Sequence, residues 1–158
     1  MLPKYHIIMG AIVSLAIYLI FQITFLQLTI IFLSSFLIDI DHYFLYIFRK
    51  KDFSLINAIK YFKERRKKWL SMKPEKRKNY KRAIFIFHGI EFWLLLIIIA
   101  NYINLIWFVL IGIFIHMVLD YIDLIYVNDY LYTKFSQLYV YYTNKRKKEF
   151  LWNFINSH

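Results

Sequence analysis

Two long apolar stretches dominate the chain, at residues 5–48 and 83–127. The hydrocarbon core of a bilayer is about 30 Å thick and takes about 20 helical residues to cross, so each stretch has room for two helices and a tight turn. The least apolar positions inside the stretches lie at 22–27 and 101–104, and we place the turns there. The pattern therefore predicts an all-α protein, a four-span transmembrane helical bundle with spans at about 5–21, 25–48, 83–100 and 103–127.

A strongly basic segment, residues 49–82, separates the two stretches. It holds 15 Lys or Arg and 3 Asp or Glu, a local net charge of +12, while the whole chain carries +11. Within it, residues 53–70 place apolar side chains at helical spacing with lysines between them, which predicts an amphipathic helix on the membrane surface. We expect this segment to bind anionic lipid headgroups. Nucleic acid is the alternative partner of a basic segment, and the neighbouring spans disfavour it.

The basic residues also predict an orientation, because Lys and Arg near the ends of spans stay in the cytoplasm. With four spans, Lys4, the basic segment and the cluster at 145–148 all fall on one side of the membrane, and both turns are uncharged. We therefore expect a single membrane-embedded domain, residues 1–158, in the cell membrane. Both termini, the basic segment and the C-terminal segment 128–158 are expected to be cytoplasmic.

Composition agrees with a membrane protein and removes several kinds of site. Hydrophobic residues make up 60% of the chain, against roughly 45–50% in soluble domains. Cysteine is absent, which excludes disulfides, thiolate zinc sites, iron–sulfur clusters and cysteine nucleophiles. A metal site in this chain must therefore be built from histidine and carboxylate ligands.

Ionisable side chains inside the predicted spans are the most informative residues. A carboxylate at the centre of a membrane helix costs about 2.5–3.5 kcal/mol on insertion scales, and it is tolerated when it is paired, hydrated or bound to a metal. Some of these residues lie three or four positions apart on one helix face, and all fall in the cytoplasmic half of the predicted bundle, which favours one common site. The set comprises His6, Asp39, Asp41, His42, His88, Glu91, His116, Asp120 and Asp123.

We interpret the first eight members of this set as ligands of a divalent metal. Histidine and carboxylate ligands without thiolate suit zinc, and also manganese or iron. The ligands are too many for one tetrahedral ion, so two ions bridged by Asp39 or Asp41 would use them better. Other interpretations stay open. A single histidine in a span is often a packing residue, Asp123 is equally well an interface residue, and buried Asp, Glu and His also build ion or proton pathways.

Three short motifs resemble a known family. The sequences HIIMG at 6–10, DIDH at 39–42 and HMVLD at 116–120 are similar to the H-x-x-x-G, D-x-D-H and H-x-x-x-D motifs of the YdjM-like family of inner-membrane, metal-dependent hydrolases. That family is related to the zinc-dependent phospholipase C and P1 nuclease group. One departure concerns residues 87–91, FHGIE, where members of the family often carry H-R-G and a second histidine. Either His88 and Glu91 replace those ligands here, or the site on this helix is altered.

The resemblance and the ligand set together predict a metal-dependent hydrolase, acting on a phosphoester of a lipid or amphiphile at the cytoplasmic face. Metal ions would bind substrate oxygens and lower the pKa of a water molecule. Glu91 or Asp41 would accept the proton of that water. The alternative is a non-catalytic membrane protein with a structural metal site or an ion or proton pathway, and an open coordination position distinguishes a catalytic site from a closed structural one.

Overall fold

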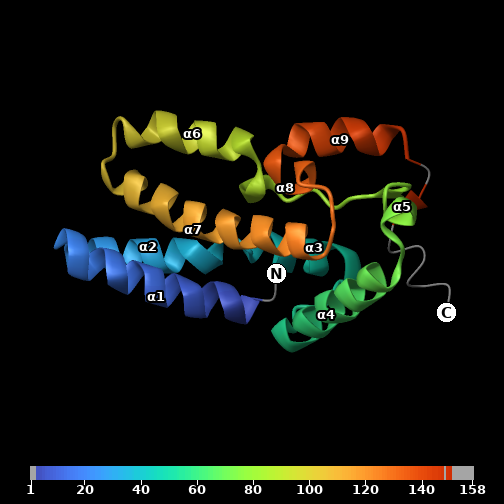
Figure 1. The fold of residues 1–158 in the computed structure, drawn as a ribbon, viewed down its shortest axis with the longest axis horizontal. Coiled ribbons are helices and arrows are strands. Elements are labelled where there is room, and N and C mark those ends of the chain that lie inside the picture. Colours follow the sequence, from blue (N-terminus) through green and yellow to red (C-terminus); the bar gives the residue numbers. More distant parts are fainter. Residues whose placement is uncertain (1–2, 148, 151–158) are drawn as a thin grey trace.

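The computed structural model describes residues 3–147 and 149–150 of the chain. Its described part is almost entirely helical, which confirms the all-α prediction (Figure 1). Two strands of two residues each form one short parallel pair, with Tyr80 opposite Glu149 and Lys81 opposite Phe150. The elements in chain order are α1 (Pro3–Phe21), α2 (Phe25–Leu37), α3 (Ile40–Lys50), α4 (Leu55–Ser71), α5 (Pro74–Arg77), β1 (Tyr80–Lys81), η1 (Ile86–His88), α6 (Ile90–Ala100), α7 (Leu105–Tyr126), α8 (Tyr132–Phe135), α9 (Gln137–Lys145) and β2 (Glu149–Phe150).

The first helical hairpin forms where the sequence predicts it. Gln22 follows α1 with a φ of 51°, which reverses the chain. Thr24 then begins α2 with a capping box, in which its hydroxyl accepts from the Gln27 backbone N–H and the Gln27 side chain accepts from the Thr24 N–H. These two bonds satisfy N–H groups that have no partner inside a helix.

The second predicted span is interrupted. α2 ends at Leu37 and α3 begins at Ile40, with a turn between them. Asp39 lies in this turn as the N-cap residue of α3, but its side chain makes no capping hydrogen bond. Its carboxylate is therefore left for other partners.

Small residues bring α1, α2 and α7 together. A Cβ atom on Gly10 of α1 would lie 2.0 Å from Ser35 Oγ, and one on Gly112 of α7 would lie 2.0 Å from Ser34 Oγ and 2.4 Å from the Ile31 carbonyl oxygen. Glycine is thus required at both crossings, and the helix backbones approach closely there. This packing brings one face of α7 against the end of α2, beside Asp39.

The prediction of one helix over 83–100 is wrong in its first half. Residues 82–85 are not helical, η1 is a short 3₁₀ turn, and α6 begins only at Ile90. The cause lies in the C-terminal segment. The Phe85 N–H donates to Gln137 Oε1 and the Arg82 N–H donates to Asn144 Oδ1, so α9 side chains satisfy backbone groups that a helix would otherwise bond internally.

Three helices in the described residues are long and apolar enough to cross a membrane, namely Pro3–Phe21, the joined Phe25–Lys50 and Leu105–Tyr126. α6 has 11 residues and measures about 16 Å, roughly half of a bilayer core. It packs beside α7 around a core of buried residues that includes Leu96, Ala100 and Ile113. The fourth membrane span is therefore not confirmed.

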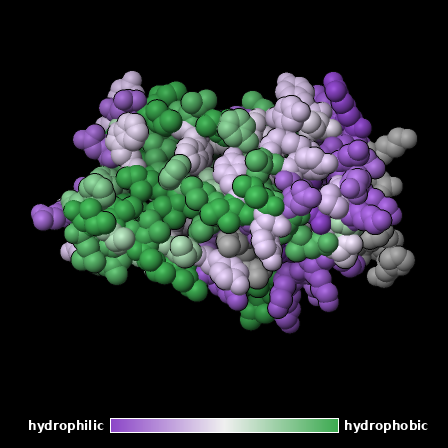
Figure 2. All heavy atoms as spheres, in the orientation of Figure 1, coloured by the Kyte–Doolittle hydropathy of each residue, from purple (hydrophilic) through white to green (hydrophobic). Residues whose placement is uncertain are grey.

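Apolar and polar surfaces separate along the molecule. Figure 2 shows apolar side chains gathered over the end that α1, α2, α6 and α7 occupy in Figure 1, and polar side chains gathered at the other end. The polar end contains α4, which confirms a helix in the basic segment. Ile56 and Ile59 on this helix are exposed. Arg66 of α4 binds Asp123 of α7 through two hydrogen bonds of 2.7 Å, which ties the basic helix to the bundle.

Candidate metal centre

Separate elements bring histidines and carboxylates to one buried place. His6 comes from α1, Asp39 from the break between α2 and α3, and Asp41 and His42 from the first turn of α3. The loop before α6 supplies His88, and α7 supplies His116 and Asp120. His6, His88 and His116 are completely buried, and Asp120 is 2% exposed. Within the described residues, three overlapping groups have ligand atoms close enough to hold one ion: His6, Asp39 and His116; Asp39, His42 and His88; and His88, His116 and Asp120.

Four of these atoms surround a common point. His88 Nε2 and His116 Nε2 lie 3.2 Å apart. Asp39 Oδ1 lies 3.4 Å from the His88 nitrogen and 3.6 Å from the His116 nitrogen. Asp120 Oδ2 lies 3.7 Å and 3.4 Å from the same two atoms. A tetrahedral zinc ion with bonds of about 2.0–2.1 Å holds its ligand atoms about 3.3–3.4 Å apart, which is close to these five distances.

The protonation of the two central histidines follows from their outer partners. His116 Nδ1 lies 2.9 Å from the Ser35 carbonyl oxygen, which can only accept, so Nδ1 carries the hydrogen. His88 Nδ1 lies 3.1 Å from Asp41 Oδ2, and a carboxylate likewise accepts. In each neutral imidazole the Nε2 atom then carries a lone pair. Unless one of the two rings takes up a second proton, two lone pairs face each other across 3.2 Å, an arrangement that a cation between them would stabilise.

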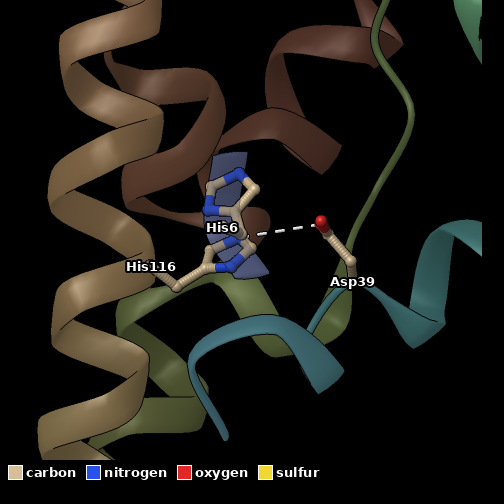
Figure 3. Close-up of side chains that lie close together, drawn as sticks. All are labelled: His6, Asp39 and His116. Carbon is tan, nitrogen blue, oxygen red and sulfur yellow. Dashed lines mark ion pairs between the residues drawn. The ribbon is translucent and has the colours of Figure 1, made fainter. Parts of the chain in front are cut away.

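His6 adds a further nitrogen beside this centre. Its ring stacks on that of His116, with centroids 3.9 Å apart, and both rings face Asp39 (Figure 3). Neither ring nitrogen of His6 has a hydrogen-bond partner among the described residues, although Nε2 lies 3.5 Å from Asp120 Oδ1. A buried imidazole without hydrogen bonds is costly, and a metal ligand position removes that cost.

Asp41 and His42 form an outer pair on the more accessible side. Asp41 Oδ1 lies 2.9 Å from His42 Nδ1, and its other oxygen contacts His88, so both carboxylate oxygens are engaged by imidazoles. The His42 ring stacks on Phe85 with centroids 3.8 Å apart. The His42 side chain is 25% exposed and that of Asp39 is 20% exposed. The cluster is therefore closed on the side of His6 and Asp120 and partly open on the side of His42.

One residue of this centre carries no signal in the sequence. Lys134 of α8 places Nζ 2.9 Å from Asp120 Oδ2. Burial by itself lowers the pKa of Lys134, but the carboxylates of Asp120 and Asp39 outweigh it and raise the pKa above its ordinary value, so the ammonium stays charged. No spacing rule singles out this lysine among the 21 Lys and Arg of the chain.

The charges of the cluster leave room for one divalent cation. Its described members include the three carboxylates of Asp39, Asp41 and Asp120 and the single ammonium of Lys134. With neutral imidazoles, these four charged groups of the described residues sum to −2, which one divalent ion neutralises. A second divalent ion would leave an excess of positive charge in a buried place, which is unfavourable.

Glu91 lies in a different setting. Its carboxylate accepts hydrogen bonds from the Ser136 hydroxyl and from the backbone N–H groups of Gln137 and Leu138, at the start of α9. Anionic groups are favourable at a helix N-terminus. Glu91 belongs to none of the three ligand groups among the described residues. This setting does not support the expected roles of Glu91 as a metal ligand and as the acceptor of a water proton.

Asp123 also lies outside the ligand groups. The structure pairs it with Arg66, in agreement with its interpretation as an interface residue between α7 and the basic helix.

Comparisons of the chain with known protein families, with curated proteins and with solved structures found no match.

Proposed function

We propose that this chain is a membrane-embedded, metal-dependent hydrolase of a phosphoester in a lipid or amphiphile, acting at the cytoplasmic face of the cell membrane. The observation that supports the metal is the close approach of the Nε2 atoms of His88 and His116, 3.2 Å apart, with carboxylate oxygens of Asp39 and Asp120 beside them. The three motifs that resemble the YdjM-like family supply the reaction class.

Zinc is the metal that the spacing favours. Two imidazoles and carboxylate oxygens at tetrahedral distances suit it, while manganese and iron prefer more ligands. The residual charge of −2 supports one ion rather than two. We therefore propose His88, His116, Asp39 and Asp120 as its ligands, with His6 as a fifth donor able to replace one of them.

A bound zinc ion supplies Lewis acidity and makes a water molecule more acidic. The chain's own residues supply the rest of the chemistry. Asp41 holds the His42 ring by its Nδ1 hydrogen, which leaves His42 Nε2 as a base on the accessible side. An imidazole oriented by a carboxylate is a common proton acceptor in hydrolases. We thus assign the proton transfer to His42, with Asp41 as its positioning residue, in place of Glu91.

The basic helix α4 adjoins this side, since its Phe62 ring lies 5.5 Å from the His42 ring. Exposed Ile56 and Ile59 can enter the membrane interface, and the lysines of α4 can bind anionic headgroups. A lipid phosphoester would thereby be drawn toward the metal centre. These contacts support an amphiphilic substrate.

A structural metal site is the second candidate, and one observation favours it. If all four donors bound one ion, they would leave no position for a water molecule, as in structural zinc sites. Such an ion would join the α2–α3 break, the loop before α6 and α7 at one point.

The test uses the full chain purified in detergent without chelators. We expect about one zinc ion per chain and hydrolysis of at least one member of a phosphoester panel. His42→Ala should keep the zinc and lose hydrolysis. Zinc binding with no hydrolysis of any phosphoester would favour the structural site, and a wild-type protein that binds no divalent metal would overturn the proposal.

A further inference from the structure

Lys134 is a lysine whose ammonium group is directed into the metal centre. Its side chain is 14% exposed, its Nζ atom lies 2.9 Å from Asp120 Oδ2, and the same atom lies 5.1 Å from the centre of the Phe85 ring. Phe85 stacks on His42. Lys134 therefore lies between the closed side of the cluster, at Asp120, and the accessible side, at His42.

The short helix α8 that carries Lys134 is fixed to the loop before α6. The Gln137 side chain bridges the two segments. Its Oε1 atom accepts a hydrogen bond from the Phe85 N–H of the loop, and its Nε2 atom donates to the Thr133 carbonyl oxygen of α8. Glu91 anchors the next turn through Ser136 and Leu138. These bonds hold the backbone on both sides of Lys134 next to the centre.

The Lys134 ammonium needs a different anionic partner once a divalent cation lies between the histidines. The cation then neutralises Asp120, and the ammonium and the cation are two positive charges close together in a poorly solvated place. Such a pair is stabilised by an anionic oxygen that contacts both. Lys is a common phosphate-binding residue and acts there as a point charge with three donors.

We propose that Lys134 Nζ binds a phosphoryl oxygen of the ligand beside the metal centre, and that this contact selects phosphate-bearing ligands over neutral ones. The inference rests on the metal of the proposed function, but not on hydrolysis. The phosphoryl group belongs either to a lipid headgroup or to free phosphate, and the experiment separates these sources.

The experiment measures zinc content and phosphate affinity of the full chain in detergent. Inorganic phosphate is titrated into zinc-loaded protein, and mixed micelles with phosphatidic acid form a second arm. Lys134→Met keeps an unbranched side chain of similar length and removes the charge. For whichever of the two ligands the wild type binds, inorganic phosphate or phosphatidic acid, we expect Lys134→Met to lower the affinity about tenfold or more. This is the usual cost of a lost charged hydrogen bond. The zinc content should stay equal or rise.

Two further variants separate ligand binding from a structural role. Lys134→Arg restores the charge and should recover most of the phosphate affinity. Lys147→Met is the matched control, because Lys147 also belongs to the C-terminal segment but contacts the Tyr132 hydroxyl; it should bind phosphate as wild type does. If Lys134→Met fails to assemble, the phosphate affinity of Lys134→Arg is compared with that of wild type in the same titration. Loss of phosphate binding in this charged variant would contradict the inference.

The outcomes distinguish the two proposals. Binding of inorganic phosphate, or of phosphatidic acid alone, that depends on Lys134 supports the inference and identifies the source of the phosphoryl group. Zinc binding with equal phosphate affinity in Lys134→Met and wild type overturns the inference and leaves the proposed function standing. Lys134-dependent phosphate binding without hydrolysis overturns only the hydrolase. A wild-type protein without zinc overturns both.

Discussion

His88 and His116 present their Nε2 atoms to each other at 3.2 Å, although 28 positions separate them in the chain. The outer nitrogen of each ring, Nδ1, makes a hydrogen bond: that of His88 to the Asp41 carboxylate and that of His116 to the Ser35 carbonyl oxygen. Because the outer nitrogens carry the hydrogens of the neutral rings, the inner ones are acceptors that repel each other unless a metal ion or a proton lies between them. The pair is thus favourable around a metal ion.

The first prediction concerns these two ligands. His116→Ala or His88→Ala should lower zinc affinity by more than the roughly 10–100-fold that loss of an outer-sphere partner costs, because each change removes a direct ligand. Metal analysis of purified protein after dialysis measures the effect. His158→Ala, at the last position of the chain, is the control and should retain the wild-type zinc content. Equal zinc content in His116→Ala and wild type would contradict the proposed ligand set.

The second prediction concerns Asp41. Asp41→Asn retains the shape of the side chain but offers only one acceptor oxygen, where the carboxylate serves both His42 and His88. We expect zinc affinity to fall roughly 10–100-fold, the range for outer-sphere partners, and hydrolysis to fall further because His42 loses its orientation. Competition with a zinc chelator gives the affinity. A loss as large as that of His88→Ala would instead identify Asp41 as a direct ligand, as the sequence suggested.

The third prediction separates two roles of Glu91. Its hydrogen bonds to α9 indicate that Glu91→Gln should lower stability by about 1.5–3 kcal/mol, the range for hydrogen bonds to a charged group. Zinc content should not change, since Glu91 lies in no ligand group of the described residues. Unfolding of the detergent-solubilised protein measures the first effect. Normal stability with complete loss of hydrolysis would restore Glu91 as the general base.

The fourth prediction concerns the number of membrane spans. The segment between β1 and the loop after α6 contains α6, a helix of only 11 residues. Figure 1 nevertheless shows this segment running beside α7 toward the end of the molecule where α1 turns into α2. We predict that this segment crosses the membrane, with its non-helical part covered by α8 and α9. Reporter fusions after Lys78 and after Ile103 should then lie in opposite compartments. Both reporters on one side would leave three spans and place the C-terminal segment opposite the basic helix.

Local sequence was sufficient for much of the helical framework. Long apolar stretches need internally bonded backbone in a membrane, so the helices near 5–21 and 103–127 and the turns at 22–24 and 101–104 could be predicted from hydropathy alone. The ionisable residues could be singled out in the same way, because a charge in an apolar helix is costly wherever that helix lies. Six of the eight predicted ligands, namely His6, Asp39, His42, His88, His116 and Asp120, belong to the groups that can hold an ion.

Tertiary contacts decided what sequence spacing could not. The start of α6 depends on the side chains of Gln137 and Asn144. They accept hydrogen bonds from the backbone N–H groups of Phe85 and Arg82, which lie 52 and 62 positions earlier in the chain. The same long-range packing turns Glu91 toward α9 and brings Lys134 to Asp120. Hydropathy is a property of each residue and its neighbours in the chain, whereas the partner of a carboxylate depends on which distant segment lies against it. That partner makes Asp120 part of the candidate metal centre, whereas Glu91 binds the N-terminus of a helix.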